Sequence, residues 1–341
     1  MQNLNFKIIY YLAIILSICF QTISASPLEI LPNEREIVGY FLDSNLREAS
    51  GIATSAYEKN QLFHVNDSGD SARLLVTDFK GKFIQSINIR NHVANDIEDM
   101  SSGKCFSGKN CLFIGDIGDN RSERKQIQLI IVEETKQLPK EISAEKILTL
   151  QYEDGPRDAE GMALGPNQHL YILSKENKLA ERLAFPSRLY ILRSENWFNS
   201  SSYPSDKAPK ILEYRGEIDL KRFSQETLMF ANVATSIDID IARKKMLILT
   251  YTAAYMISLN LNAAGEIDWR EDKAPQNKDI VKIPLKRLFQ QEAVTFLPLN
   301  TSKIPTNENI EVWSFLYTSE APPGPIPPEL VRVELKEIYG K

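Results

Sequence analysis

The chain has 341 residues, of which 43% are hydrophobic and 25% charged, so it holds enough apolar material for one large domain or two small ones. This composition excludes a disordered chain and a small fold that depends on disulfides. Lys and Arg number 40 against 45 Asp and Glu, and the net charge of −5 offers no basic surface for nucleic acid. We therefore expect a globular protein with a substantial core and no nucleic-acid partner.

Residues 1–25 have the layout of a secretory signal peptide. Lys7 is their only charge, the apolar run Ile8–Phe20 follows it, and small residues end the segment. That run is shorter than the roughly 20 residues that span a bilayer, which favours cleavage over an uncleaved anchor. We expect residues 26–341 to form a single exported domain, secreted or periplasmic, without a membrane span.

Two cysteines, Cys105 and Cys111, remain once this leader is removed. An even number of cysteines in an exported chain, separated by a turn-rich segment, predicts a disulfide. Zinc is the weaker alternative, because two thiols without two further ligands nearby form a poor site.

Short β-branched and aromatic runs recur after residue 36, separated by Gly, Asn, Asp and Pro, and no strong helical period is present. Five segments share a polar residue followed by alternating apolar positions, and each precedes two or three further strand-like runs. Their starting positions are Ser50, Glu98, Glu160, Ser236 and Glu292. These repeated starts favour an all-β fold, a β-propeller of five four-stranded blades, over a β-sandwich.

The last repeat lacks a fourth strand, whereas the segment Glu36–Phe41 precedes the first repeat without a partner of its own. We expect this segment to complete the last blade, because closing the ring removes exposed sheet edges. Six blades are the alternative if the stretch between Glu176 and Ser236 contains a further blade. Within that stretch, Leu179–Ala184 and Phe223–Phe230 read instead as short helical insertions.

A propeller gathers residues from all of its blades at one mouth of the central channel, which we call the funnel. The five starting positions, the residues two positions earlier and the loops after the second strands should meet there. The predicted funnel face contains Glu48, Ser50, Asp67, Asp96, Asp119, Arg124, Arg157 and Ser236. Because carboxylates outnumber cations in these segments, the funnel should be strongly acidic.

Converging carboxylates must be protonated, paired with cations or neutralised by a bound ion. Oxygen ligands without Cys or His suit calcium, with magnesium as the alternative. We predict a divalent cation held by some of Glu98, Asp116, Glu160 and Glu292, with Asn66 and Asn120 as neutral ligands. Two accounts need no metal: the loop residues form ordinary turns, or nearby arginines and a lysine pair with the carboxylates.

The sequence contains no serine-nucleophile elbow, no glycine-rich phosphate loop and no zinc-protease helix motif. A hydrolytic base would have to be a histidine on the acidic face or a carboxylate whose pKa its neighbours raise. The catalytic candidates are His92, Asp158 and Lys175.

Five motifs in order resemble a family of secreted bacterial β-propellers, largely uncharacterised and sometimes labelled esterase-like or phytase-like. The motifs are EASGIA at 48–53, NDSGD at 66–70, NDIED at 95–99, GDIGDN at 115–120 with Arg124 following, and DAEG at 158–161. The match spans nearly the whole mature chain. More remotely, the architecture is similar to calcium-dependent lactonase and phosphotriesterase propellers, which hold a cation on the axis with Glu, Asn and Asp.

Two functions follow as expectations. The first is a calcium-dependent hydrolase of esters, lactones or phosphoesters, in which the ion polarises a substrate oxygen. The alternative is a non-catalytic extracytoplasmic propeller that binds a glycan, a peptide or an envelope partner, because propellers host both kinds of function. In either case the ligand lies on the acidic face, and we expect a monomer.

Overall fold

The computed structural model describes residues 28–178, 183–197, 208–226, 228, 230–298 and 310–338. The expected signal peptide lies outside the described residues, as does part of each expected helical insertion. No helix in the described ranges is long and apolar enough to cross a membrane.

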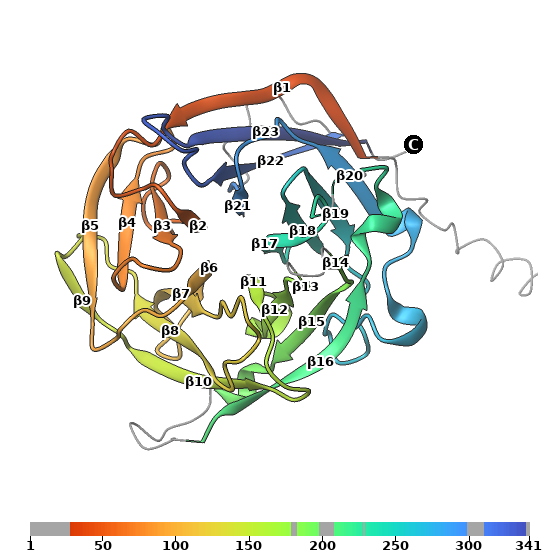
Figure 1. Ribbon diagram of the computed structural model, residues 1–341, viewed down its shortest axis with the longest axis horizontal. Coiled ribbons are helices and arrows are strands. Elements are labelled where there is room, and N and C mark those ends of the chain that lie inside the picture. The colour runs from red at the N-terminus through yellow and green to blue at the C-terminus, as the bar shows by residue number, and fades with distance from the viewer. Residues whose placement is uncertain are drawn as a thin grey trace, which may run out of the picture.

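The described chain is almost entirely β-structure, with sheets arranged around a central axis (Figure 1). Five units of four strands account for most of it. Unit 1 comprises β2 (Ala49–Thr54), β3 (Leu62–Asn66), β4 (Arg73–Thr77) and β5 (Phe83–Arg90), and unit 2 comprises β6 (Ile97–Lys104), β7 (Asn110–Asp116), β8 (Ile127–Glu133) and β10 (Lys146–Tyr152). Unit 3 comprises β11 (Ala159–Leu164), β12 (Leu170–Ser174), β15 (Ser187–Leu192) and β16 (Lys210–Ile218), and unit 4 comprises β17 (Ala234–Asp240), β18 (Lys245–Thr250), β19 (Ala253–Ser258) and β20 (Ile280–Pro284). Unit 5 comprises β21 (Gln291–Phe296), β22 (Ile310–Ser319), β23 (Glu329–Ile338) and β1 (Leu28–Tyr40).

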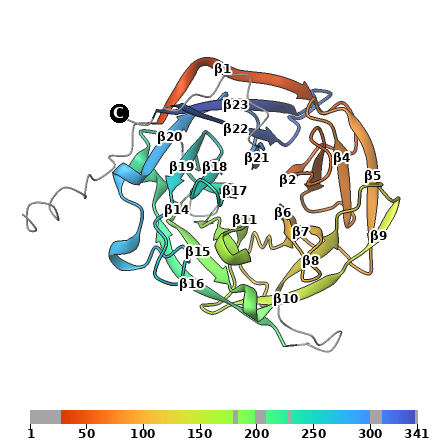
Figure 2. The same ribbon diagram turned by 180° about the vertical axis from the view of Figure 1, so that it is seen from behind.

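The innermost strands of the units form a closed cycle. Strands β2, β6, β11, β17 and β21 contact one another in this order, and β21 returns to β2. The same ring is visible from behind in Figure 2. Among the described residues, five buried hydrophobic clusters each lie between two neighbouring units. The expected all-β architecture is confirmed, and the arrangement is compatible with a β-propeller.

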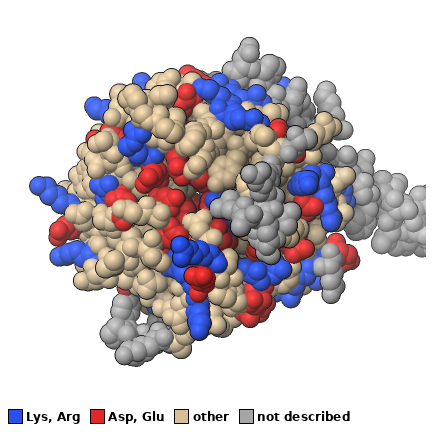
Figure 3. Space-filling model, viewed as in Figure 1, with Lys and Arg blue, Asp and Glu red and all other residues tan. Residues whose placement is uncertain are grey.

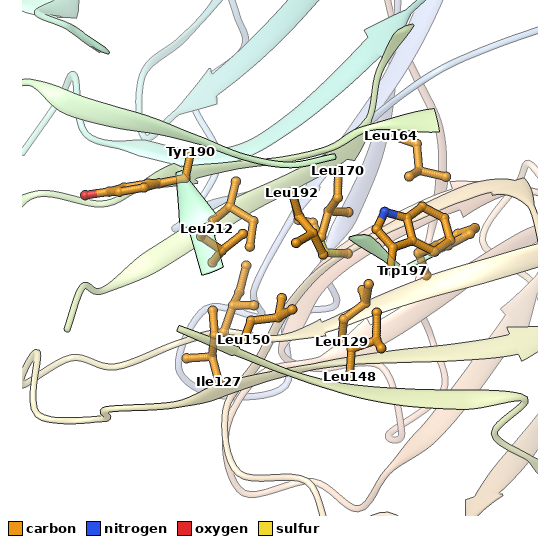
Figure 4. Packing of buried hydrophobic residues seen from close by; sticks show 14 of the residues in the cluster. Ile127, Leu129, Leu148, Leu150, Leu164, Leu170, Tyr190, Leu192, Trp197 and Leu212 are labelled. Carbon is orange, nitrogen blue, oxygen red and sulfur yellow. The ribbon is translucent and has the colours of Figure 1, made fainter. Parts of the chain in front are cut away.

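Strand β8 shows how the sequence produces this packing. Its apolar residues alternate between two clusters, because successive side chains of a strand point to opposite faces. Leu129 packs toward unit 3, whereas the next residue, Ile130, packs toward unit 1. Figure 4 shows the interface with unit 3, where Trp197 closes one end. The Trp197 ring lies edge-on to Phe113 at 5.5 Å between centroids.

The N-terminal strand closes the ring as predicted. Strand β1 pairs antiparallel with β23. It thereby supplies the outer strand that the last unit otherwise lacks. The strand is longer than the predicted segment Glu36–Phe41 and begins at Leu28. Gly39 passes so close to unit 1 that a Cβ atom there would lie 1.8 Å from the Lys80 carbonyl oxygen.

Two parallel pairings cover outer edges of the units. The short strand β9 (Glu141–Ser143) pairs with β5, and β10 pairs with β16, which joins units 2 and 3 into one eight-stranded sheet. Covered edges cannot pair with other chains.

The stretch between Glu176 and Ser236 forms no further four-stranded sheet within its described part. It supplies β15 and β16 to unit 3 and the hairpin β13 (Asn177–Lys178) with β14 (Leu183–Ala184). The expected helix at Leu179–Ala184 is therefore wrong at its described end. Short 3₁₀ turns complete the structure: η1 (Pro166–Gln168), η3 (Ser194–Asn196), η4 (Leu220–Phe223), η5 (Glu271–Lys273) and η6 (Asn277–Asp279).

Cys105 and Cys111 form the expected disulfide across the turn between β6 and β7, with Cα atoms 5.4 Å apart. Both residues are buried, and Gly108 adopts a φ of 80° within the turn.

Replacing both cysteines by serine should cost about 2 kcal/mol of unfolding free energy, because the closed loop is short. Urea unfolding measures this cost, and full labelling of both thiols in the denatured, unreduced protein would contradict the pairing.

His64 makes stability depend on pH. The residue is fully buried, its Nε2 lies 2.8 Å from Thr77 Oγ1, and its ring lies edge-on to Phe41. Burial lowers the pKa of His64 to about 3. Since this pKa lies below that of the unfolded chain, the His64 contribution is complete above pH 6.5 and declines as the pH falls toward 3.

At pH 5 the loss relative to pH 7.5 should be about 2 kcal/mol. The difference between wild type and His64→Gln in urea unfolding, measured at both pH values, isolates this residue from the carboxylates. A difference that does not change with pH would contradict the effect.

Candidate functional site

Every inner strand carries a β-bulge near its first residue. The register of each strand skips one residue, and these are Ser50, Glu98, Glu160, Thr235 and Glu292. A bulge redirects the side chain of the extra residue. The three glutamates therefore occupy equivalent positions around the axis, as their repeat in the sequence indicated.

The bulge position of unit 4 is held by Thr235 and not by Ser236. Ser50 Oγ donates to the Ile97 carbonyl at 3.0 Å, and Thr235 Oγ1 donates to the Gln291 carbonyl at 2.7 Å, which is the same contact one unit on. Ser236 lies one residue further into the ring, where its hydroxyl donates to Asp99. The assignment of Ser236 to the funnel face is thus corrected: the residue is fully buried.

Acidic side chains gather around the middle of the ring on the face shown in Figure 3. Among the described residues, Asp67, Asp96 and Glu98 place one carboxylate oxygen each within 4.8 Å of one another. Asp67 follows β3 of unit 1, and the other two surround the start of β6 in unit 2. We call these three residues the carboxylate cluster.

The neighbouring motif GDIGDN leaves room for this cluster. A Cβ atom on Gly118 would lie 2.2 Å from Glu98 Oε1 and 2.6 Å from Asp96 Oδ2, so only glycine fits. The Gly118 amide donates to the Asp96 carbonyl at 3.1 Å. Asp96 Oδ1 is buried and has no hydrogen-bond partner.

Without a bound cation, the carboxylates of the cluster are buried close to one another, which disfavours their charged forms. Burial, followed by the charges of Asp67 and Asp158, raises the pKa of Asp96 to about 7. Burial, followed by Glu160 and Asp67, raises the pKa of Glu98 well above its usual range. A cation among these oxygens would relieve both effects.

The other two bulge glutamates share a lysine. Lys175 Nζ contacts Glu160 Oε1 in a buried ion pair, and the ammonium lies 5.4 Å from the centre of the Tyr251 ring. A hydrogen bond joins the side chains of Glu160 and Glu292. Burial raises the pKa of Glu160 to about 7 against the effect of Lys175, and burial and Glu160 raise that of Glu292.

Asp116, predicted as a cation ligand, is saturated by hydrogen-bond donors. Its fully buried carboxylate accepts from His92 Nε2 at 3.1 Å, Asn95 N at 2.9 Å, Asp96 N at 3.2 Å and Arg124 Nη2 at 2.8 Å. Although burial acts to raise the pKa of Asp116, these donors lower it below its usual range. The structure therefore places Asp116 beneath the carboxylate cluster as a support for the 92–96 loop.

Each of the three catalytic candidates has an internal partner. The His92 side chain is 3% exposed and held on Asp116. Asp158 is buried and accepts from the Asp119 amide at 3.0 Å. Burial acts to lower the pKa of Lys175, but Glu160 and Glu292 raise it above its usual range, so the amine stays protonated.

The remaining predicted residues are spread over the same face. Asn66 donates its amide to the Asn45 carbonyl and to Asp70, and its Oδ1 is buried without a partner. Asp119 accepts from the Arg124 amide, and Glu48 is exposed. Arg157 pairs with Asp154 and Glu176, and its Nε donates to the Tyr190 hydroxyl.

A cavity of about 700 Å³ opens beside the carboxylate cluster. Asp67, Asn120, Glu160, Lys175 and Glu292 line it together with Tyr251, Gln290 and Glu320. Asn177, Thr252 and Arg287 also line it, and the rest of the lining is an apolar wall of Leu228, Phe230, Ala231, Val233, Leu288 and Phe289. The sequence reading missed this apolar wall, since the loops before β17 and β21 carry no motif.

No family model and no curated protein matches the chain. Among solved structures, the chain is similar to a crystal structure of glucose dehydrogenase, with 9% identity, a TM-score of 0.42, and 88% of this chain and 99% of that chain covered. A second glucose dehydrogenase shows 10% identity and a TM-score of 0.44, with 88% and 98% covered. No functional assignment follows from these likenesses.

Proposed function

We propose that the protein is a secreted or periplasmic five-bladed β-propeller whose acidic funnel binds a divalent cation, calcium first and magnesium second. The five units are its blades, and residues 1–25 are removed on export, which leaves 26–341 as one domain. The cycle of inner strands and the five clusters between neighbouring units support the five-bladed ring.

One observation carries the cation proposal. Asp67, Asp96 and Glu98 converge within 4.8 Å, and the buried Asp96 Oδ1 lacks a partner. An all-oxygen set of carboxylates suits calcium or magnesium. Glu160 and Glu292 are compensated by Lys175, and Asp116 by its donors, so the cation lies further toward unit 1 than the sequence predicted. Asn66 is a suitable neutral ligand through its unpartnered Oδ1.

Hydrolysis of an ester-type bond is the activity that this arrangement favours. The bound cation would polarise an oxygen of a substrate held in the adjoining cavity. Glu160 lines that cavity, and its pKa of about 7 suits a group that takes a proton from water near neutral pH. Lys175 holds the Glu160 carboxylate in place.

A non-catalytic binding propeller is the second candidate. The observation that favours it is the commitment of His92, Asp158 and Lys175 to internal partners. Hydrolysis of a panel of carboxylic and phosphoric esters, with calcium and with chelator, separates the two. Calcium-dependent turnover that Glu160→Gln abolishes supports the hydrolase, whereas calcium binding without any turnover supports the binding protein.

Chelation should lower the melting temperature. A cation that binds only the folded state adds about 2.7 kcal/mol at a hundredfold excess over its Kd. Asp96→Asn should abolish this response, while Asp78→Asn, in an exposed turn, should retain it.

Because protons compete with the cation for the Asp96 carboxyl, whose pKa is about 7, cation binding should be tighter at pH 8 than at pH 6. Calorimetry that detects neither calcium nor magnesium binding at millimolar concentration would refute the cation proposal.

A further inference from the structure

The cavity beside the carboxylate cluster has two chemically distinct walls. Glu160, Glu292 and Glu320 contribute the carboxylates, which we call the polar wall, and Phe230 and Phe289 belong to the apolar residues, which we call the apolar wall. The apolar residues come from the loops before β17 and β21, and β21 itself carries Glu292. A ligand that fills this space must combine a polar group with an apolar body.

The charges on the polar wall are only partly compensated. Lys175 is committed to the Glu160 ion pair and to the face of Tyr251. Arg287 is 55% exposed and pairs with Glu226. Within the described part of the chain, neither Glu292 nor Glu320 forms an ion pair of its own. Glu292 shares a hydrogen bond with Glu160 and is close enough to Lys175 to be compensated by it, so within the described residues Glu320 is the carboxylate of this wall that has no ion pair and no such partner.

We propose that the cavity binds an organic ammonium group attached to an apolar body, and that this is the substrate class of the site, an inference that rests on the proposed function. The ammonium donates to Glu320, and the apolar body packs against Phe230 and Phe289. Aromatic faces also attract ammonium groups directly. An organic anion is repelled by the same wall, and a neutral alcohol leaves its carboxylates uncompensated.

The pH dependence has a defined sign. Burial, followed by the charge of Asp67, raises the pKa of Glu320, and burial and Glu160 raise that of Glu292. Lowering the pH therefore protonates the Glu320 carboxylate that pairs with the ammonium, so binding weakens as the pH falls.

Calorimetry with three matched probes tests the inference: 2-phenylethylammonium, 2-phenylethanol and 3-phenylpropionate, each at pH 8 with calcium and with chelator. The ammonium should bind at least tenfold more tightly than the alcohol, and the anion should not bind. Glu320→Gln should weaken ammonium binding at least fivefold. Glu141→Gln, in an exposed pair with Arg90 on the outer edge, is the control and should change nothing.

Two results separate this inference from the cation proposal. If calcium binds but the ammonium binds no more tightly than the alcohol, or not at all, the ammonium site is refuted and the cation centre stands. If the ammonium binds with the stated preference and calcium does not, the ammonium site is supported and the cation centre falls. Unchanged ammonium affinity in Glu320→Gln would also overturn the inference.

Discussion

Replacing Asp99 by alanine should lower the free energy of unfolding by about 4 kcal/mol, because the change strands buried donors at the centre of the ring. The Asp99 carboxylate accepts from the backbone amides of Met100 at 2.8 Å, Met162 at 2.9 Å and Ile237 at 3.3 Å. The Ser236 hydroxyl adds a fourth hydrogen bond at 3.1 Å. One side chain thereby ties together the inner strands of units 2, 3 and 4.

The space for this carboxylate comes from the equivalent residues of the other units. The residue after each bulge is Gly51, Gly161, Ser236 or Ala293, all of them small. A Cβ atom on Gly51 would lie 2.9 Å from the Asp99 Cα. Asp99 is therefore the single long side chain in a layer of small ones, and it fills the axis below the funnel.

Urea unfolding of three variants tests this role. Asp99→Ala should show the full loss, and Ser236→Ala should lose about 1 kcal/mol, since one hydrogen bond disappears while the carboxylate keeps three donors. Asp78→Ala, whose carboxylate accepts two amides in an exposed turn, should change stability by less than about 1 kcal/mol. Equal losses of unfolding free energy in Asp99→Ala and Asp78→Ala would show that the Asp99 carboxylate contributes no more to stability than a carboxylate in an exposed turn.

The sequence allowed the repeated strand starts to be recognised, because the same polar-then-alternating pattern marks each inner strand. The sequence could not show which residue the register skips at each β-bulge. Thr235 and Ser236 are both hydroxyl residues followed by an apolar alternation, so the pattern alone could not tell which one the register skips. The register of β17, together with the shared contact of Ser50 and Thr235 with the carbonyl before the next bulge, resolves the alignment.

The ligand set was harder to predict than the fold, since it depends on which carboxylates find internal partners. Asp116 had the right residue type and the right strand end, but the 92–96 loop supplies three donors that the sequence does not reveal. Asp67 and Asp96 were expected on the funnel face and not as ligands. Their convergence depends on Gly118, whose missing side chain leaves room for Asp96 and Glu98.

Removing β1 should destabilise the whole ring and not just one edge. A chain that begins at Phe41 keeps the buried Phe41 beside His64 but loses all pairing with β23. At about 1 kcal/mol net per hydrogen bond, the loss is roughly 5 kcal/mol. This corresponds to a fall of about 10 °C in melting temperature, and the exposed β23 should promote aggregation. A chain that begins at Leu28 is the control and should melt like the full-length protein.

Hydrogen exchange distinguishes ring closure from local fraying. If β1 closes the ring, its removal releases unit 5 from unit 1, and the five inner strands lose the cycle of contacts that makes them cooperative. Amide protection should then fall in β11 and β12, on the far side of the ring, as well as in β22 and β23. If β1 only covers an edge, protection falls in β22 and β23 alone and the melting temperature of the rest is unchanged. Val38 of β1 packs against the hydrophobic cluster between units 5 and 1, which contains Phe41. We therefore expect protection to fall in β11 and β12 as well as in β22 and β23.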